Sequence, residues 1–383
     1  MKKILSFASL LAAAVMLISC EETQQDTPGI NATGISLKCD KDVIKCDGTD
    51  FSKLSVVADD GTEIKEGVTF FDSDMNEVSV PDFKFQTDKE GTYTLWAAYK
   101  TFNSAQITIK AIKADVPAVV ADPNPSSTSF VRRVFINQFT GTGCGYCPSM
   151  IYTLRSVLAE DNFKNKTVLA ASHSYNTNDP AYISTPNAGN FGGTGYPYLA
   201  VDMAVGYSDY TSSSKLASTL QGRFDAESAK VGISANPKYA KALLPNSNGT
   251  YEDYLIVRVA VKAAEDGEYS VGAWLLEDNI YGVQDDYKGI KKLDKDHDYD
   301  THDNCIRVAD SKSGNSWAGH ELGKIEAGKT VTKTFLLRVK SSWKLENMHM
   351  AIFVGAKNEK GAYTINNVID CPADSATAFE YKK

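Results

Sequence analysis

The chain has 383 residues, of which 43% are hydrophobic and 23% are charged, so it is long enough to form two or three domains with buried cores. Its formal net charge is −8, and its 40 Lys and Arg residues form no basic stripe. Because phosphate binding needs clustered cations, this composition excludes nucleic acid as an expected partner.

The N-terminus has the pattern of an export signal over residues 1–19. Lys2 and Lys3 precede an apolar run at 4–16, which is shorter than the about 20 residues that a membrane-spanning helix needs. The run ends in LISC, which resembles the lipobox of bacterial lipoproteins. The resemblance implies cleavage before Cys20 and lipidation of its sulfur, and hence a membrane partner; an ordinary secretory signal with a chance cysteine is the alternative.

The next segments are a predicted tether and a predicted all-β domain. Residues 20–33 are polar and contain Pro and Gly, which predicts a flexible tether. Residues 34–114 alternate β-branched and aromatic runs with Asp-Gly and Glu-Gly turns, which predicts a β-sandwich. The layout resembles a bacterial immunoglobulin-like (Ig-like) domain, and EGTYTLWAAYK at 90–100 is similar to that family's penultimate strand. Cys39 and Cys46 flank a turn, so we predict a Cys39–Cys46 disulfide, with two buried thiols as the alternative.

Two further domains are predicted beyond a Pro- and Ser-rich linker at 115–129. Residues 130–230 contain a strand, a helix that starts at CGYC, a second strand, a Tyr-Pro turn into a third strand, and a final helix. This order is that of the α/β thioredoxin fold. Residues 231–383 contain strong strands around polar loops, which predicts an all-β sandwich. The predicted fold is therefore multidomain, with Ig-like, thioredoxin-like and β-sandwich units in that order.

Several segments resemble one family. FTGTGCGYCP, HSYNTNDP, GYP and GAWLLEDNIYGVQ, followed by HDNCIR, are similar to the Omp-twenty-eight-related outer-membrane lipoproteins, over about residues 130–383. The resemblance implies a thioredoxin-like core fused to a C-terminal β-sandwich on an outer-membrane lipoprotein, at the periplasmic face or the cell surface. It implies architecture more than activity, because the family's biochemical role is poorly defined.

Cys144 and Cys147 form a CxxC pair at the predicted start of a helix. Free backbone N–H groups and the helix dipole stabilise a thiolate at such a position. Cys144 would attack a disulfide and Cys147 would resolve the mixed disulfide, so we predict a redox-active Cys144–Cys147 disulfide. The thioredoxin resemblance implies that Pro197 is a cis-proline facing the pair, and that the Tyr196 backbone pairs with a substrate strand.

Departures from thioredoxins weaken the redox prediction. Gly143 stands where thioredoxins have an aromatic residue, and Gln138 stands where they have a buried acid. The residues between the two cysteines add no positive charge. His173 on the next strand is a candidate proton carrier in place of the acid; the alternative is a core histidine whose ring nitrogens are bonded to backbone.

The remaining cysteines and a run of acids are the other candidate sites. Proximity in sequence favours a Cys305–Cys371 disulfide as the third pair. A zinc site is not expected, because there is no second CxxC. Four acids alternate as in a calcium loop, but the sixth position is Tyr299 rather than Gly, so calcium is a weak prediction and a solvated loop the stronger one. These four acids are Asp294, Asp296, Asp298 and Asp300.

Two functions follow from these observations. The first is thiol–disulfide exchange at the cell envelope, with protein thiols or disulfides as partners and no cofactor beyond the cysteine pair. The second is a non-enzymatic binding or adhesion lipoprotein that uses the thioredoxin fold as a scaffold and binds an envelope or surface protein. An exposed Cys144 sulfur would favour exchange. A pair covered by the 174–182 segment or by the third domain would favour the scaffold.

Overall fold

The computed structural model describes residues 33–314 and 316–383. The export signal, the lipidation site Cys20 and almost all of the tether lie outside the described residues. The described chain is mostly β and contains several sheets, as expected for a multidomain β-rich protein. In this part of the chain, none of the helices combines the length and the apolar character needed to cross a bilayer.

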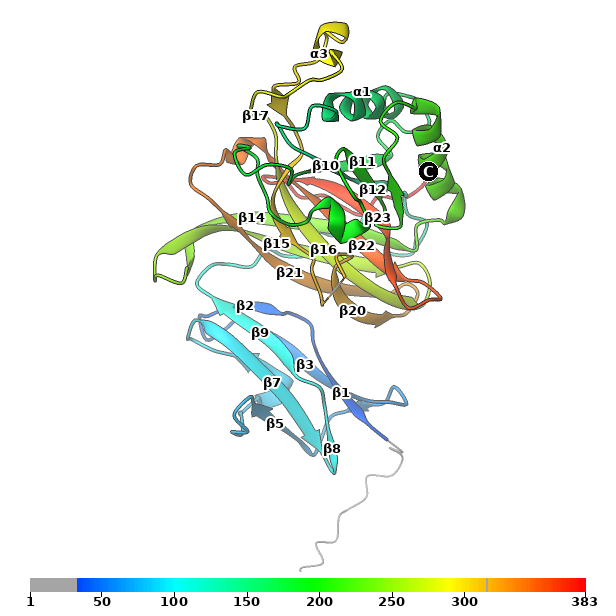
Figure 1. Cartoon of the computed structure of the whole chain (residues 1–383). Coiled ribbons are helices and arrows are strands. Elements are labelled where there is room, and N and C mark those ends of the chain that lie inside the picture. Colours follow the sequence, from blue (N-terminus) through cyan, green and yellow to red (C-terminus); the bar gives the residue numbers. More distant parts are fainter. Residues whose placement is uncertain (1–32, 315) are drawn as a thin grey trace, which may run out of the picture.

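The N-terminal residues form two facing sheets, which lie at one end of the molecule (Figure 1). In Phe51–Ala58 and in Gly91–Tyr99, buried residues alternate with more exposed ones, which gives each sheet one apolar face for the shared core. One sheet contains β1 (Ile35–Cys39), β3 (Phe51–Ala58), β4 (Glu63–Ile64) and β6 (Lys84–Gln86). The other contains β2 (Val43–Lys45), β9 (Ile107–Ile112), β7 (Gly91–Tyr99), β5 (Val68–Asp72) and β8 (Phe102–Asn103).

A nine-stranded sheet organises the rest of the molecule. Its strands come from both sides of the domain boundary predicted at residue 230, because β11 pairs in parallel with β19 at Ala171 and Cys305. The order along the sheet is β13 (Val205–Tyr207), β12 (Tyr198–Val201), β10 (Val134–Thr140), β11 (Thr167–His173), β19 (Cys305–Asp310), β16 (Gly267–Glu277), β22 (Met348–Lys357) and β23 (Tyr363–Pro372), with β20 (His320–Ile325) beside β16.

A three-stranded sheet packs on one face of this large sheet. It consists of β14 (Val231–Pro245), β15 (Tyr251–Ala263) and β21 (Thr330–Val339). Its apolar residues share one core with the residues of β16, β22 and β23 that face it. On the other side of β16, Trp274 packs edge-on against Phe135 of β10, so strands from both sides of the boundary predicted at residue 230 also share a core. Strands β16 and β22 are therefore buried on both faces.

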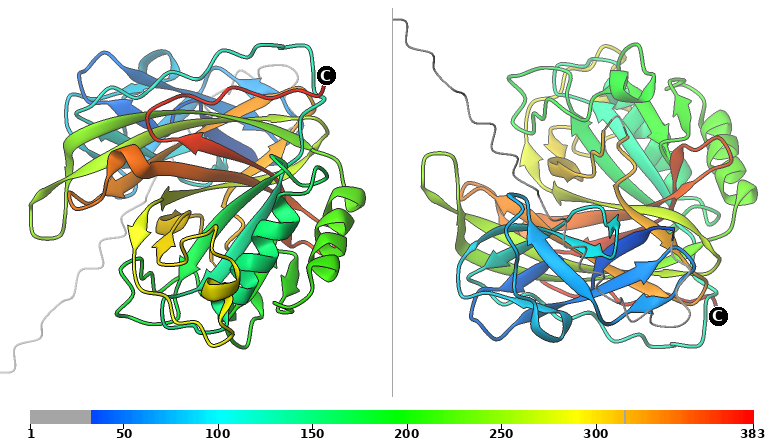
Figure 2. Two further views of the ribbon diagram at one scale, coloured as in Figure 1. Left: turned by 90° about the horizontal axis from the view of Figure 1, so that it is seen from above. Right: turned by 90° about the horizontal axis from the view of Figure 1, so that it is seen from below.

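Two helices cover the outer face of β10 and β12. They are α1 (Cys147–Leu158) and α2 (Ser213–Ala226), and both views in Figure 2 show them on the same side of the sheet. Met150 and Leu154 of α1 lie in one core with Val134 and Ile136 of β10. A long excursion between β16 and β19 passes beside α1. It contains β17 (Ile280–Tyr281), α3 (Ile290–Leu293) and β18 (Thr301–His302).

Candidate functional site

The CxxC sequence lies where the buried strand β10 turns into α1. The strand ends at Thr140, and the helix begins at Cys147, with Pro148 in its first turn, where a missing N–H costs no helical hydrogen bond. Cys144 and Cys147 are joined by a disulfide with Cα atoms 5.4 Å apart. Their exposed fractions are 3% and 0%, so the pair is buried.

The segment that follows β11 covers one side of the CxxC loop. Asn176 Oδ1 accepts a hydrogen bond from the Gly143 N–H at 3.2 Å, and Asp179 Oδ2 accepts one from the Thr142 N–H at 2.7 Å. The Asn176 amide also donates to the Thr142 hydroxyl at 3.4 Å. These contacts fix the backbone just before Cys144.

The excursion after β16 covers the other side. Gln284 Nε2 lies 3.2, 3.1 and 3.0 Å from the carbonyl oxygens of Gly141, Thr142 and Cys144. The Asp285 N–H donates to the Thr142 carbonyl at 2.8 Å. Gln284 is 3% exposed, so one buried amide from the C-terminal part of the chain holds the loop that carries the disulfide.

The side chains that cover the loop explain why glycine stands at positions 143 and 145. A Cβ on Gly145 would lie 2.4 Å from the ring of Tyr287, whose backbone N–H also bonds to the Gly145 carbonyl at 2.8 Å. A Cβ on Gly143 would lie 3.3 Å from the side chain of Asn176. The position before Cys144, aromatic in thioredoxins, is therefore small because Asn176 packs directly over it.

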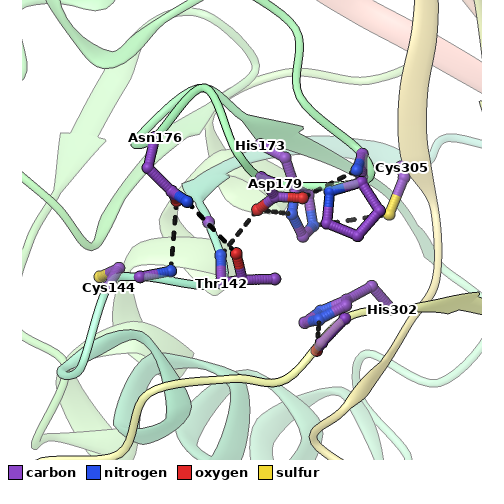
Figure 3. A network of polar contacts seen from close by, with 12 residues as sticks. Thr142, Cys144, His173, Asn176, Asp179, His302 and Cys305 are labelled. Atoms are coloured by element: carbon purple, nitrogen blue, oxygen red, sulfur yellow. Dashed lines mark hydrogen bonds and ion pairs between the residues drawn. The ribbon is translucent and has the colours of Figure 1, made fainter.

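A chain of polar contacts runs from this loop into the interior (Figure 3). Asp179 Oδ2 lies 2.9 Å from His173 Nδ1, and His173 Nε2 lies 3.5 Å from Cys305 Sγ. Burial raises the pKa of the Cys305 thiol well above its ordinary value, so the thiol stays protonated. Both ring nitrogens of His173 thus have a partner, Asp179 at Nδ1 and Cys305 at Nε2.

Asp179 stays ionised within this chain. Burial alone would raise its pKa, but the hydrogen bond and charge of His173, with the N–H groups of Thr142 and Ala181, lower the pKa to about 2. His302 stacks edge-on against His173 with ring centroids 4.9 Å apart. Burial, and then the neighbouring His173, lower the pKa of His302, so its neutral ring donates to the Gly282 carbonyl at 2.8 Å.

Pro197 and Tyr196 lie at the start of β12, next to the cover. The Tyr196–Pro197 peptide is cis, and Pro197 is buried. The register pairs Phe139 with Tyr198, which sets Pro197 beside the end of β10. The Tyr196 hydroxyl lies 2.9 Å from Ser174 Oγ, and its ring packs against that of Tyr175 with centroids 5.3 Å apart.

The other two predicted disulfides are wrong. Among the described residues, Cys39, Cys46, Cys305 and Cys371 are free thiols. The strand order places β16 and β22 between Cys305 and Cys371, so about 14 Å separates strands that a disulfide would need within about 7 Å. Cys39 ends a strand of one N-terminal sheet, whereas Cys46 bonds to Ile112 of the facing sheet.

The four alternating acids do not converge. Asp294 pairs with Arg155 and accepts from the Tyr299 hydroxyl at 2.8 Å, while Asp300 pairs with Lys291 at 2.6 Å. Asp298 accepts from the Thr301 hydroxyl at 2.6 Å. Within the described chain, no group of three or more His, Cys, Asp or Glu side chains is placed to hold a metal ion. Asp294, Asp298 and Asp300 act instead as local braces of the excursion that covers the CxxC loop.

Sequence reasoning missed Gln284 and Asp179, the two side chains that do most to hold the loop. Asp179 lies in HSYNTNDP and Gln284 ends GAWLLEDNIYGVQ, two of the segments on which the family prediction was based. The signal was therefore in the sequence. Nothing in the local pattern shows that these segments meet, because Gln284 and Cys144 are 140 residues apart.

Comparisons with known proteins add limited information. No family model and no curated protein matches the sequence. Among solved structures, the chain is similar to HBP35 of Porphyromonas gingivalis, with 17% identity and a TM-score of 0.49 over 66% of this chain and 78% of that one. A protein from Agrobacterium tumefaciens is similar with 13% identity and a TM-score of 0.40, over 66% of this chain and 98% of that one. At these values neither similarity carries an argument about function.

Proposed function

We propose that this chain is a lipid-anchored binding protein of the outer membrane, built from an Ig-like unit, a thioredoxin-like unit and a C-terminal β-sandwich. In this proposal the thioredoxin-like unit is a scaffold, and the Cys144–Cys147 disulfide is a structural link that shapes the loop. The anchor rests on the lipobox resemblance at Cys20. The outer-membrane location rests on the resemblance to the Omp-twenty-eight-related family.

One observation carries the scaffold role. The disulfide is buried, and the loop that bears it is bonded from both sides, by Asn176 and Asp179 and by Gln284. Exchange requires in-line attack of an external thiolate on a sulfur, so access limits the rate. With Cys144 only 3% exposed, a protein substrate has no approach to this sulfur while the cover is closed.

Thiol–disulfide exchange is the second candidate, and the position of the pair favours it. Cys147 opens α1, and Tyr146 at its N-cap makes no side-chain capping bond, so the helix end is available to stabilise a thiolate. Exchange would require the 284–287 segment to move away from the loop. The two candidates therefore differ in whether the cover opens.

Reduction kinetics test the proposal. The chain without its export signal, with Cys20→Ser, is treated with dithiothreitol, and the freed thiols are labelled with a maleimide before and after denaturation. We expect slow labelling of Cys144 in the folded chain, and labelling at least tenfold faster in Tyr287→Ala, which uncovers Gly145. Equal and fast labelling in both proteins would contradict the scaffold role. Tyr281→Ala, an exposed aromatic residue of the same excursion, is the matched control.

A further inference from the structure

Two histidines meet where the excursion packs against β11 (Figure 3). His173 ends β11, His302 ends β18 of the excursion, and their rings lie edge-on with centroids 4.9 Å apart. The two residues are 1% and 6% exposed. The buried contact between the excursion and the sheet therefore contains two ionisable rings of the same kind.

The two carboxylates whose charge acts most strongly on His302 are already engaged. Asp179, from the segment after β11, lies 2.9 Å from His173 and accepts bonds from two backbone N–H groups. Asp300, from the excursion itself, pairs with Lys291 at 2.6 Å. A proton on His302 would therefore share each carboxylate with a cation or donor that already uses it.

The other ionisable groups beside His302 come from α1, β19 and the excursion. Arg155 of α1 lines the same cavity of about 330 Å³ as His302 and is paired with Asp294. Cys305 of β19 stays protonated, because burial raises the pKa of its thiol. Asp303 is exposed, so water screens its charge. The remaining groups are neutral near pH 7 and belong to the excursion; they are His297 and Tyr299.

A proton added to His302 weakens the contact with β11. Its Nε2 donates to the Gly282 carbonyl at 2.8 Å, so the added proton goes to Nδ1. Burial, and then the neighbouring His173, lower the pKa of His302 below its ordinary value of 6.5. An exposed histidine takes up a proton more readily than this one. A form in which His302 has left β11 therefore gains population as the pH falls below about 6.5.

His302 is coupled to the residues that cover the CxxC loop. It pairs with Ile280 in the β17–β18 ladder, and its ring bonds to the Gly282 carbonyl, two residues before Gln284. The N–H groups of Asp285 and Tyr287 each donate to a carbonyl of the loop at 2.8 Å. A shift of His302 therefore carries with it the segment that covers the disulfide.

The base of the excursion keeps its bonds at acid pH. Asp278 accepts the Asn304 N–H at 2.7 Å and lies 3.3 Å from His349 Nε2. Burial alone would lower the pKa of His349, but hydrogen bonds to Asp278 and Asp370 raise it to about 9. The charge of His349 is therefore the same at about pH 5 and about pH 7.5. The two ends of the excursion stay joined while residues 280–302 respond to acid.

We propose that residues 280–302 form an acid-sensitive lid: protonation of His302 separates its ring from His173, and the lid moves away from the CxxC loop while its base at Asp278 stays in place. At neutral pH the lid is closed and the disulfide is covered. Acid breaks the bonds from Gln284, Asp285 and Tyr287 to the loop and uncovers it.

This inference goes beyond the proposed function, because it concerns the attachment of the excursion and not the reactivity of the disulfide. The two fail separately. Fast reduction of the pair at neutral pH would refute the scaffold role without bearing on the effect of acid. A lid that stays closed in acid would refute the inference and leave the covered disulfide as it is.

Hydrogen–deuterium exchange tests the lid. The oxidised Cys20→Ser chain without its export signal is exchanged at about pH 7.5 and about pH 5.0, and each rate is corrected for the chemical exchange rate at that pH. We expect the protection of residues 284–287 to fall about tenfold or more in acid, whereas β15, which is paired on both sides, keeps its protection. Unchanged protection of 284–287, or an equal loss in β15, overturns the inference.

Two substitutions locate the sensor. His302→Gln keeps a donor for the Gly282 carbonyl but takes up no proton, so the protection of 284–287 should no longer depend on pH. His297→Gln is the matched control. It removes another histidine of the lid, whose ring packs against Tyr299 with centroids 4.6 Å apart, and should keep the pH dependence of the parent. The parent's pH response in His302→Gln, or its loss in His297→Gln, overturns the assignment.

NMR titration of the His302 ring in the parent chain decides the case in which His302→Gln opens the lid at every pH. The ring should titrate with a midpoint below its ordinary 6.5, and the loss of protection at 284–287 should share this midpoint. A ring that titrates without loss of protection overturns the inference. Loss of protection at a pH where the ring does not titrate overturns it equally.

Discussion

The CxxC loop and the end of β10 that precedes it are neighbours in the fold, but their buried polar groups differ in how they are bonded. In the loop, the backbone groups of Gly141, Thr142 and Gly143 are bonded to Gln284, Asp285, Asn176 and Asp179. At the end of β10, Gln138 and Thr140 are just as buried, but Gln138 Nε2 and Thr140 Oγ1 have no hydrogen-bond partner among the described residues. The backbone of the loop is thus held by the rest of the chain, whereas these two side-chain atoms of β10 add no hydrogen bond to the fold.

Removing Gln284 should give the largest effect on stability. Gln284→Ala removes the donor shared by three buried carbonyl groups and leaves a cavity, so we expect the free energy of unfolding to fall by about 2–4 kcal/mol. Urea unfolding measures the change. The control is Gln221→Ala, an exposed side chain with one bond to Asp225, which should cost less than about 0.5 kcal/mol. Equal losses in the two variants would show that Gln284 does not hold the loop.

Opening the disulfide should come next. The pair closes a short loop with a sequence separation of 3, so the double substitution Cys144→Ser, Cys147→Ser should lower the free energy of unfolding by about 2 kcal/mol. The measurement is urea unfolding without reductant. A structural disulfide predicts this loss. No measurable loss of stability would argue that the pair is kept for its reactivity instead.

The pH dependence of stability tests the bond between Asp179 and the loop. The folded pKa of Asp179 is about 2, below its ordinary value of 3.8, so its contribution is fully present above about pH 4 and is lost as the pH falls through 2. The shift corresponds to about 2 kcal/mol. Asp179→Asn should therefore be less stable than the parent at pH 7, and the gap should narrow between pH 4 and pH 2. A gap that stays constant over this window would mean that the ionised carboxylate contributes nothing.

The smallest effect on stability is expected at Gln138 of β10. Gln138→Leu removes an amide whose Nε2 has no partner among the described residues, so the free energy of unfolding should stay the same or rise by up to about 1 kcal/mol. A loss of 2 kcal/mol or more would break the contrast between Gln138 and the CxxC loop.

The local features of this site could be predicted from the sequence, and the tertiary ones could not. The strand, the CxxC pair and Pro148 are contiguous, so the helix that begins at Cys147 follows from local pattern. The cover could not be predicted, because Gln284 reaches the loop from an excursion between two strands of the C-terminal region.

The prediction of a Cys305–Cys371 disulfide was wrong for the same reason, because long-range contacts decide which residues meet. Cys305 and Cys371 are the nearest remaining pair in sequence, but the strand order of the large sheet puts two strands between them and brings Cys305 to His173 instead. Long-range strand pairing decides such neighbours, and it leaves no mark on the periodicity of either strand. Burial also explains why Cys305 is retained as a thiol in this position.

The reduction potential of the Cys144–Cys147 pair tests the central claim most directly. It is obtained by glutathione titration of the Cys20→Ser chain without its export signal, with Cys144→Ser as the control for mixed disulfides. A covered structural disulfide predicts a potential below about −300 mV and no glutathione trapped on Cys144. A potential between about −120 and −270 mV, with a mixed disulfide formed at Cys144, would place the protein among exchange catalysts and contradict the scaffold role.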